Sequence, residues 1–215
     1  MNKNLTELVF IIDKSGSMSG LEKDTIGGFN SLIEKQKKEP GNAIVSTILF
    51  SDVIDVIHDR LDIDQVPNLT SKDYFVCGCT ALLDAIGQTL TRIIHVQENL
   101  NEDEQPGKTL FIITTDGKEN SSKEYSYKKI KELINMVKEK YNYEFIFLGA
   151  NIESEEEASK LGIDCDNAVT YKNDSEGIKL NYCALHEAIT NVRLGDKLNK
   201  TWRKNIDKDV KRRGK

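Results

Sequence analysis

Residues 8–19 read LVFIIDKSGSMS, and this stretch decides the fold. Its first five residues, Leu8 to Ile12, form an unbroken apolar run rich in β-formers, which is typical of a strand buried on both faces of a parallel sheet. The run stops at Asp13, and the glycine and hydroxyl residues that follow are typical of a tight loop. The chain therefore begins with a predicted strand that ends in a carboxylate.

The rest of the chain alternates between helical and strand patterns. Residues 108–115 contain a second buried strand, and it ends at Asp116 as the first one ended at Asp13. The strands predicted at 43–50 and 53–57 are joined only by Ser51 and Asp52, which is too short for a parallel crossover, so they should pair antiparallel. The other predicted elements are helices at 21–38, 80–96, 123–140, 153–161 and 175–193, and strands at 143–148 and 168–171. This order predicts a doubly wound α/β fold: a six-stranded, mostly parallel sheet with one antiparallel edge strand and helices on both faces.

Composition favours a single domain with a charged extension. The 215 residues are 38% hydrophobic and 30% charged, enough apolar matter for a sizeable core. We assign residues 1–195 to the domain and 196–215 to a basic C-terminal tail. The tail has a local charge of about +6, although the net charge of the whole chain is −5. We expect a solvated tail that a disordered segment could replace. Contact with RNA, a membrane or the domain itself is the alternative, and Trp202 among Arg203 and Lys204 is the only aromatic support for nucleic acid.

The sequence predicts a cytoplasmic protein. No apolar run approaches the ~20 residues that cross a bilayer, and residues 1–6 are polar with no signal-peptide core behind them. Inside the cell the four cysteines would stay reduced. Cys77 and Cys79 are one residue apart, but no second pair follows at zinc-like spacing.

Three separate segments place oxygen donors at the predicted carboxyl end of the sheet. After the first strand, Asp13 is followed by hydroxyls at Ser15 and Ser17, and Gly16 permits the loop to turn tightly. Thr80 adds a hydroxyl from a second loop, and Asp116 adds a carboxylate after the neighbouring strand. Hard oxygen ligands suit Mg²⁺, Mn²⁺ or Ca²⁺. Taken alone, the first segment would fit an ordinary turn and helix cap equally well.

With these residues in view, the chain resembles the von Willebrand factor type A domain family, of the bacterial, intracellular type. That family has a metal-ion-dependent adhesion site with the pattern Asp-x-Ser-x-Ser, then Thr, then Asp. The pattern is intact here at Asp13, Ser15, Ser17, Thr80 and Asp116, and the resemblance covers about residues 5–195. It implies that the three hydroxyls bind the metal directly when a ligand is present, and that Asp13 and Asp116 act through bound water or exchange into direct coordination. It also implies a non-enzymatic module whose metal binds an Asp or Glu side chain of a partner protein.

The alternative is an enzyme, a metal-dependent phosphohydrolase of the haloacid dehalogenase type with Asp13 as nucleophile. That group usually carries a second Asp two residues later as the general acid. Ser15 stands there in this chain, and a hydroxyl that stays protonated near neutral pH cannot serve as that acid.

Several polar residues near these segments are expected to have structural roles. We expect Thr80 to be the N-cap of the helix that follows it, and Asn120, Ser121 and Ser122 to cap the helix predicted from residue 123 or, alternatively, to line the rim of the site. Asp84 should offset a helix dipole or orient a loop. The remaining expectations concern histidines: surface or edge positions for His58 and His95, and a packing or capping role for His186.

Overall fold

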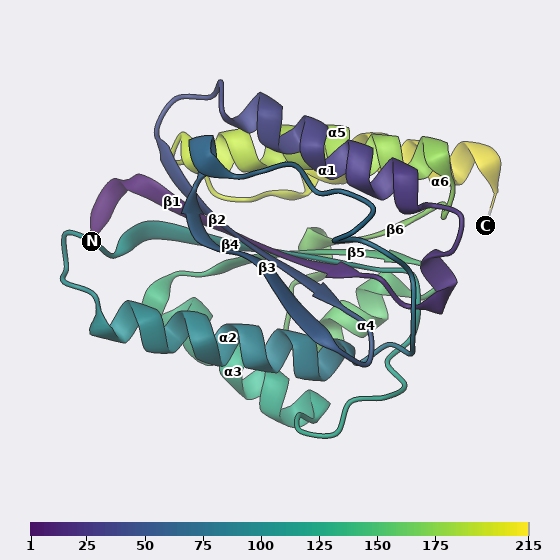
Figure 1. Ribbon diagram of the computed structural model, residues 1–215, viewed down its shortest axis with the longest axis horizontal. Coiled ribbons are helices and arrows are strands. Elements are labelled where there is room, and N and C mark those ends of the chain that lie inside the picture. The colour runs from purple at the N-terminus through teal and green to yellow at the C-terminus, as the bar shows by residue number, and fades with distance from the viewer. Residues whose placement is uncertain (215) are drawn as a thin grey trace.

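The structure, a computed structural model, describes residues 1–214 around one six-stranded sheet (Figure 1). The strand order is β3-β2-β1-β4-β5-β6, and only the β2–β3 pair is antiparallel. The strands are β1 (Asn2–Asp13), β2 (Asn42–Phe50), β3 (Ile54–Asp62), β4 (Pro106–Thr115), β5 (Glu144–Ala150) and β6 (Ala168–Tyr171). The predicted doubly wound fold with a reversed edge strand is confirmed.

Helices cover both faces of the sheet, as Figure 1 shows with α1, α5 and α6 on one side and α2 and α3 on the other. The helices are α1 (Glu22–Gln36), α2 (Leu82–Asn99), α3 (Tyr127–Tyr141), α4 (Ser154–Leu161), α5 (Ser175–Arg193) and α6 (Lys204–Arg213). Because side chains alternate along a strand, β1 supplies both layers. Leu8 and Phe10 face the core under α1 and α5, whereas Val9 and Ile11 face the core under α2 and α3. Full burial of each such side chain contributes roughly 1.5–3 kcal/mol.

Helix α3 begins at Tyr127 instead of residue 123 because an acidic side chain holds the preceding segment in a loop. The Asp84 carboxylate accepts hydrogen bonds from the backbone N–H groups of Lys123, Glu124 and Tyr125 at 2.7–2.9 Å. The N-cap is then Ser126, whose hydroxyl accepts from Lys129 N. Asp84 therefore orients a loop, which is one of the two roles expected for it.

Of the surface or edge position expected for His58, the structure bears out the edge but not the surface. His58 lies on edge strand β3 but is only 2% exposed, because its ring stacks on Phe29 of α1 with centroids 6.1 Å apart. Its Nδ1 is within 2.9 Å of the Thr47 hydroxyl. Burial lowers the pKa of the ring, which therefore belongs to the core as a neutral group.

The segment after Arg193 is folded against the domain. Trp202 and Ile206 are 5% and 2% exposed and belong to the core that α1 and α5 share with the sheet. Arg203, the N-cap residue of α6, donates to the carbonyls of Cys165 and Ala168. The prediction of a solvated tail that a disordered segment could replace is therefore wrong for residues 200–213. It did not take into account the apolar side chains that this segment buries. Lys215 lies outside the described residues, and the boundary at residues 195 and 196 stays a prediction.

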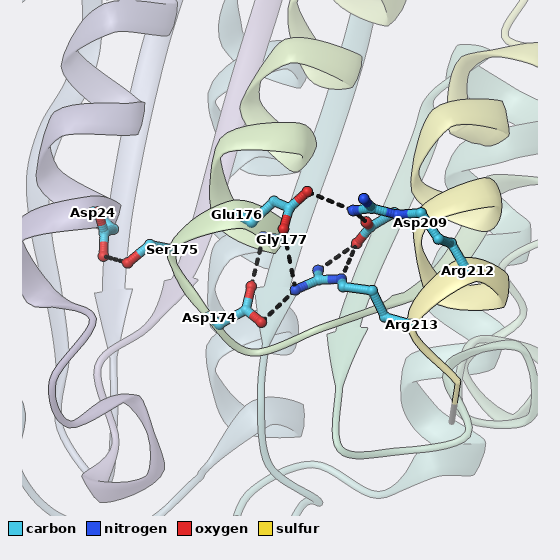
Figure 2. A network of polar contacts seen from close by, with 8 residues as sticks. All are labelled: Asp24, Asp174, Ser175, Glu176, Gly177, Asp209, Arg212 and Arg213. Carbon is cyan, nitrogen blue, oxygen red and sulfur yellow. Dashed lines mark hydrogen bonds and ion pairs between the residues drawn. The ribbon is translucent and has the colours of Figure 1, made fainter.

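The basic residues at the end of α6 are paired with acidic ones (Figure 2). Arg213 bonds to Asp209 one turn earlier and, at 2.5 Å, to Asp174, the N-cap of α5. Arg212 reaches Glu176 at 2.6 Å. Three of the basic residues predicted for the tail, Arg203, Arg212 and Arg213, are therefore paired with acidic residues.

No helix in the described part of the chain has both the length and the apolar character needed to cross a bilayer.

We expect Trp202→Ala and Ile206→Ala to lower the free energy of unfolding by about 3–5 and 2–5 kcal/mol, because each removes a buried side chain and leaves a cavity. Denaturant titration measures this difference. Lys208→Ala, on the exposed face of α6, is the control and should change stability by less than about 0.5 kcal/mol. Wild-type stability in both core variants would show that α6 does not pack on the domain.

Candidate metal centre

The candidate site lies at the carboxyl ends of two adjacent parallel strands. In the β1–β4 ladder Ile12 pairs with Thr114, so Asp13 and Asp116 follow neighbouring strands almost in register. Both side chains are buried, at 0% and 2% exposed. The loops that leave parallel strands at this edge are where doubly wound folds bind ligands.

The first loop folds back on Asp13. The Asp13 carboxylate accepts from Ser15 N at 2.7 Å and from the Thr115 hydroxyl at 2.7 Å. The Ser15 and Ser17 hydroxyl oxygens lie 3.1 Å apart, and a single 3-10 turn, η1 (Gly16–Met18), carries Ser17 to the surface. The loop thus places two hydroxyls beside one buried carboxylate.

Thr80 points into the site and does not cap α2. Its hydroxyl donates to Ser15 Oγ at 3.1 Å, and the N-cap position of α2 is Ala81, which offers no side-chain bond. Asn120 fixes Thr80 from outside: its side-chain oxygen accepts from Thr80 N at 2.9 Å, and its N–H donates to Thr80 O at 3.1 Å. The expected capping role is therefore wrong for Thr80, and it is also wrong for Asn120, Ser121 and Ser122 because Ser126 caps α3. Asn120 instead lies beside the site, which was the alternative expected for it.

Asp116 completes a continuous set of oxygen atoms. Its Oδ1 accepts a hydrogen bond from the Ser17 hydroxyl, so the contacts run from Thr80 through Ser15 and Ser17 to Asp116. Gly117 follows, and a Cβ built there would lie 3.1 Å from Thr80 Oγ1 and 3.4 Å from Ser17 Oγ. The structure thus brings together all five residues that the sequence singled out.

Three residues that sequence reasoning missed hold these side chains. Thr115 bonds to Asp13, the Tyr74 hydroxyl donates to the Asp13 carbonyl at 2.7 Å, and Asn173 Nδ2 donates to Asp116 Oδ2 at 2.8 Å. The position of Thr115, at a strand end directly before Asp116, was a usable signal. Tyr74 and Asn173 lie in loops whose path the sequence does not reveal.

The site concentrates negative charge without a basic partner. Burial raises the pKa of the Asp13 carboxyl, and hydrogen bonds from Thr115 and Ser15 only partly offset this effect. Burial likewise raises the pKa of Asp116, against hydrogen bonds from Ser17 and Asn173. Within residues 1–214 neither carboxylate forms an ion pair with Lys, Arg or His. Two buried carboxylates with only neutral donors around them favour a bound cation.

These donors fit a hard divalent ion. All are carboxylate or hydroxyl oxygens, which Mg²⁺, Mn²⁺ and Ca²⁺ prefer over softer ligands. Ser15, Thr80 and the carboxylates are buried, whereas Ser17 is exposed, so the cluster opens to solvent on the Ser17 side.

Comparison with protein families agrees with this arrangement. Residues 7–181 match the family model described as von Willebrand factor type A domain. The chain belongs to this family. A search of curated proteins with the sequence of this chain found no match.

Solved structures share the fold at low sequence identity. Proximal thread matrix protein 1 from the mussel byssus, solved with a zinc-occupied MIDAS motif, has a TM-score of 0.59 and 13% identity, and the match covers 88% of this chain. A von Willebrand factor type A protein from Catenulispora acidiphila has a TM-score of 0.55 and 15% identity, and the match covers 91% of this chain. The ArnB paralog VWA2 from Sulfolobus acidocaldarius has a TM-score of 0.51 and 20% identity, and the match covers 86% of this chain. The present chain matches less than half of the length of each of these three proteins, namely 47%, 44% and 45% of their chains in the same order.

In the presence of a chelator, we expect Asp13→Asn to be more stable than wild type near neutral pH. The folded state raises the pKa of Asp13, so its contribution to stability is present below the ordinary value of 3.8 and is lost as pH rises through the raised pKa. The amide removes that loss. Urea titrations between acidic and neutral pH measure the difference in the free energy of unfolding between the variant and wild type. This difference should vanish at acidic pH.

Asp103→Asn, on an exposed loop, is the control for the change of charge and should match wild type at every pH. A destabilised Asp13→Asn at neutral pH would show that the buried charge is compensated within the metal-free protein.

Proposed function

We propose that this type A domain is a metal-dependent protein-binding module. Asp13, Ser15, Ser17, Thr80 and Asp116 would hold one divalent ion, Mg²⁺ or alternatively Mn²⁺ or Ca²⁺, and the ion would bind an Asp or Glu side chain of a partner. The observation that carries the proposal is the convergence of these oxygens around two buried carboxylates that have no basic partner among residues 1–214.

The division between neutral and charged ligands explains why the ion would favour an acidic partner. Ser15, Ser17 and Thr80 are hydroxyls and would leave most of the positive charge of a directly bound ion unneutralised. Asp13 and Asp116 are already engaged by Thr115, Ser15, Ser17 and Asn173 and would act through bound water, as the family resemblance implies. The exposed Ser17 side leaves space for a carboxylate from outside.

The contacts of Asp13 argue against the phosphohydrolase alternative. A nucleophilic carboxylate must reach a phosphorus atom, but the Asp13 side chain is 0% exposed and both of its oxygens accept hydrogen bonds. Ser15, where the general acid would stand, is bonded to Ser17 and Thr80. We therefore propose a binding role and no catalytic residue.

Two observations bear on where the domain acts and what it binds. All four cysteines are free thiols, which supports a cytoplasmic location. Arg203, Arg212 and Arg213 pair with acidic residues of the domain, which lowers the C-terminal charge available to nucleic acid and favours a protein partner.

We expect Mg²⁺ or Mn²⁺ to raise the melting temperature of the wild-type chain. At 100 times its dissociation constant, an ion that binds only the folded state adds about 2.7 kcal/mol, or ~5–10 °C for a chain of this size. Ser17→Ala and Asp13→Ala should lose the increase. Ser19→Ala, exposed and just outside the predicted ligands, is the matched control and should keep it. An equal increase in all four proteins would place the metal elsewhere.

We expect partner binding to depend on both the metal and a carboxylate. Proteins retained from lysate on the immobilised wild-type chain should elute with a chelator or with acetate, since both compete at the ion. Chloride at equal ionic strength should not release them, and immobilised Ser17→Ala should not retain them. Partners that elute only with salt, or that bind Ser17→Ala equally, would contradict the proposed mode of binding.

A further inference from the structure

Two cysteines lie directly before one of the proposed metal ligands. Cys77, Gly78 and Cys79 precede Thr80, and both thiols are free. Cys79 is exposed, whereas Cys77 is half-buried with its sulfur 3.8 Å from the Ser51 hydroxyl. One thiol is thus open to reagents from solvent, and the other is close to it along the chain.

The backbone of this short segment is bonded to the first metal loop. Cys77 N donates to Lys14 O at 2.9 Å, and Gly78 O accepts from Gly16 N at 3.1 Å. Lys14 and Gly16 flank Ser15, whose hydroxyl accepts from Thr80. Together with Asn120, which bonds to Thr80 N and O, residues 77–79 therefore influence where the hydroxyls of Ser15 and Thr80 meet.

The segment is short enough to bring the two sulfurs together, and Gly78 is its central residue. Two residues of extended chain span at most about 7 Å, and a disulfide needs Cα atoms about 4.4–6.8 Å apart, so a bent segment is within reach. Gly78 already bends it with a φ of +73°. A Cβ built at Gly78 would lie 1.7 Å from Asp52 Oδ1, so the exposed Gly78 backbone lies directly against the Asp52 side chain. Ring closure must also draw the Cys77 sulfur away from Ser51.

We propose that Cys77 and Cys79 are a thiol–disulfide exchange site for a low-molecular-weight disulfide such as oxidised glutathione. The Cys79 thiolate attacks the glutathione disulfide, forming a mixed disulfide and releasing one reduced glutathione. The Cys77 thiolate then attacks the Cys79 sulfur and releases the second glutathione. The two cysteines lose two electrons and two protons in total, and the reagent's disulfide takes up both.

The disulfide would weaken metal binding, an effect that rests on the function proposed above. Closing so small a ring would rotate Gly78, break the hydrogen bond from Gly16 N to Gly78 O and displace Thr80, which directly follows Cys79. A small strained ring also has a relatively oxidising potential, so ordinary glutathione levels keep it reduced and a rise in oxidised glutathione closes it. Oxidation therefore acts as a reversible control on the metal site.

The test uses the full chain carrying Cys165→Ser and Cys183→Ser, which leaves only this pair. After equilibration with glutathione at graded ratios, alkylation and intact mass should show loss of both thiols with no glutathione attached. Calorimetry with Mn²⁺ should then show affinity lowered about 10- to 100-fold, the usual effect of disturbing the support of a metal ligand, and a reductant should restore it.

Cys79→Ser in the same background is the matched control, since it cannot form the disulfide and should bind Mn²⁺ equally at every glutathione ratio. Two persistent thiols, a stable mixed disulfide, or an oxidised protein with unchanged Mn²⁺ affinity would each overturn the proposal. A reduced protein that takes up no Mn²⁺ contradicts the proposed function instead, and the thiol count still decides whether the disulfide forms.

Discussion

The arrangement of the site depends on two carboxylates that the sheet forces together. Asp13 and Asp116 follow adjacent parallel strands, and the pairing of those strands leaves them no freedom to separate. Burial makes their charge costly, and the surrounding donors are neutral hydroxyl, amide and backbone groups. A structure that holds such a pair for binding gives up stability in the metal-free state and regains it when a cation arrives.

The loops around these carboxylates hold one another in place. Asn120 fixes Thr80 through both of its backbone hydrogen-bonding groups, and Asn173 fixes Asp116. Asn173 also adjoins Asp174, which caps α5 and pairs with Arg213 of α6. The hydroxyls and carboxylates are thus supported from several elements, which is what a preorganised ligand site requires.

Much of the domain could be predicted because its signals are local. Buried strands and amphipathic helices show their periods directly, and β6 and α5 begin and end at the predicted residues. Local rules failed where distant groups competed with them. Thr80 has the side chain of an N-cap but bonds to Ser15 instead, and His58 lies on an edge strand but is covered by Phe29. A charged segment after Arg193 concealed the few apolar residues that dock it.

The sequence by itself determined the succession of the six strands and of helices α1 to α5 along the chain, and the five oxygen-bearing residues at strand and loop ends. Hydrophobic periodicity and short spacings are local properties of the sequence. Only the tertiary structure decided which groups surround those five. Asn120, Asn173 and Tyr74 reach the site from loops whose course depends on how helices pack on the sheet. The folding of residues 200–213 onto the domain was likewise decided in three dimensions, since Trp202 and Ile206 are buried only against elements far away in the sequence.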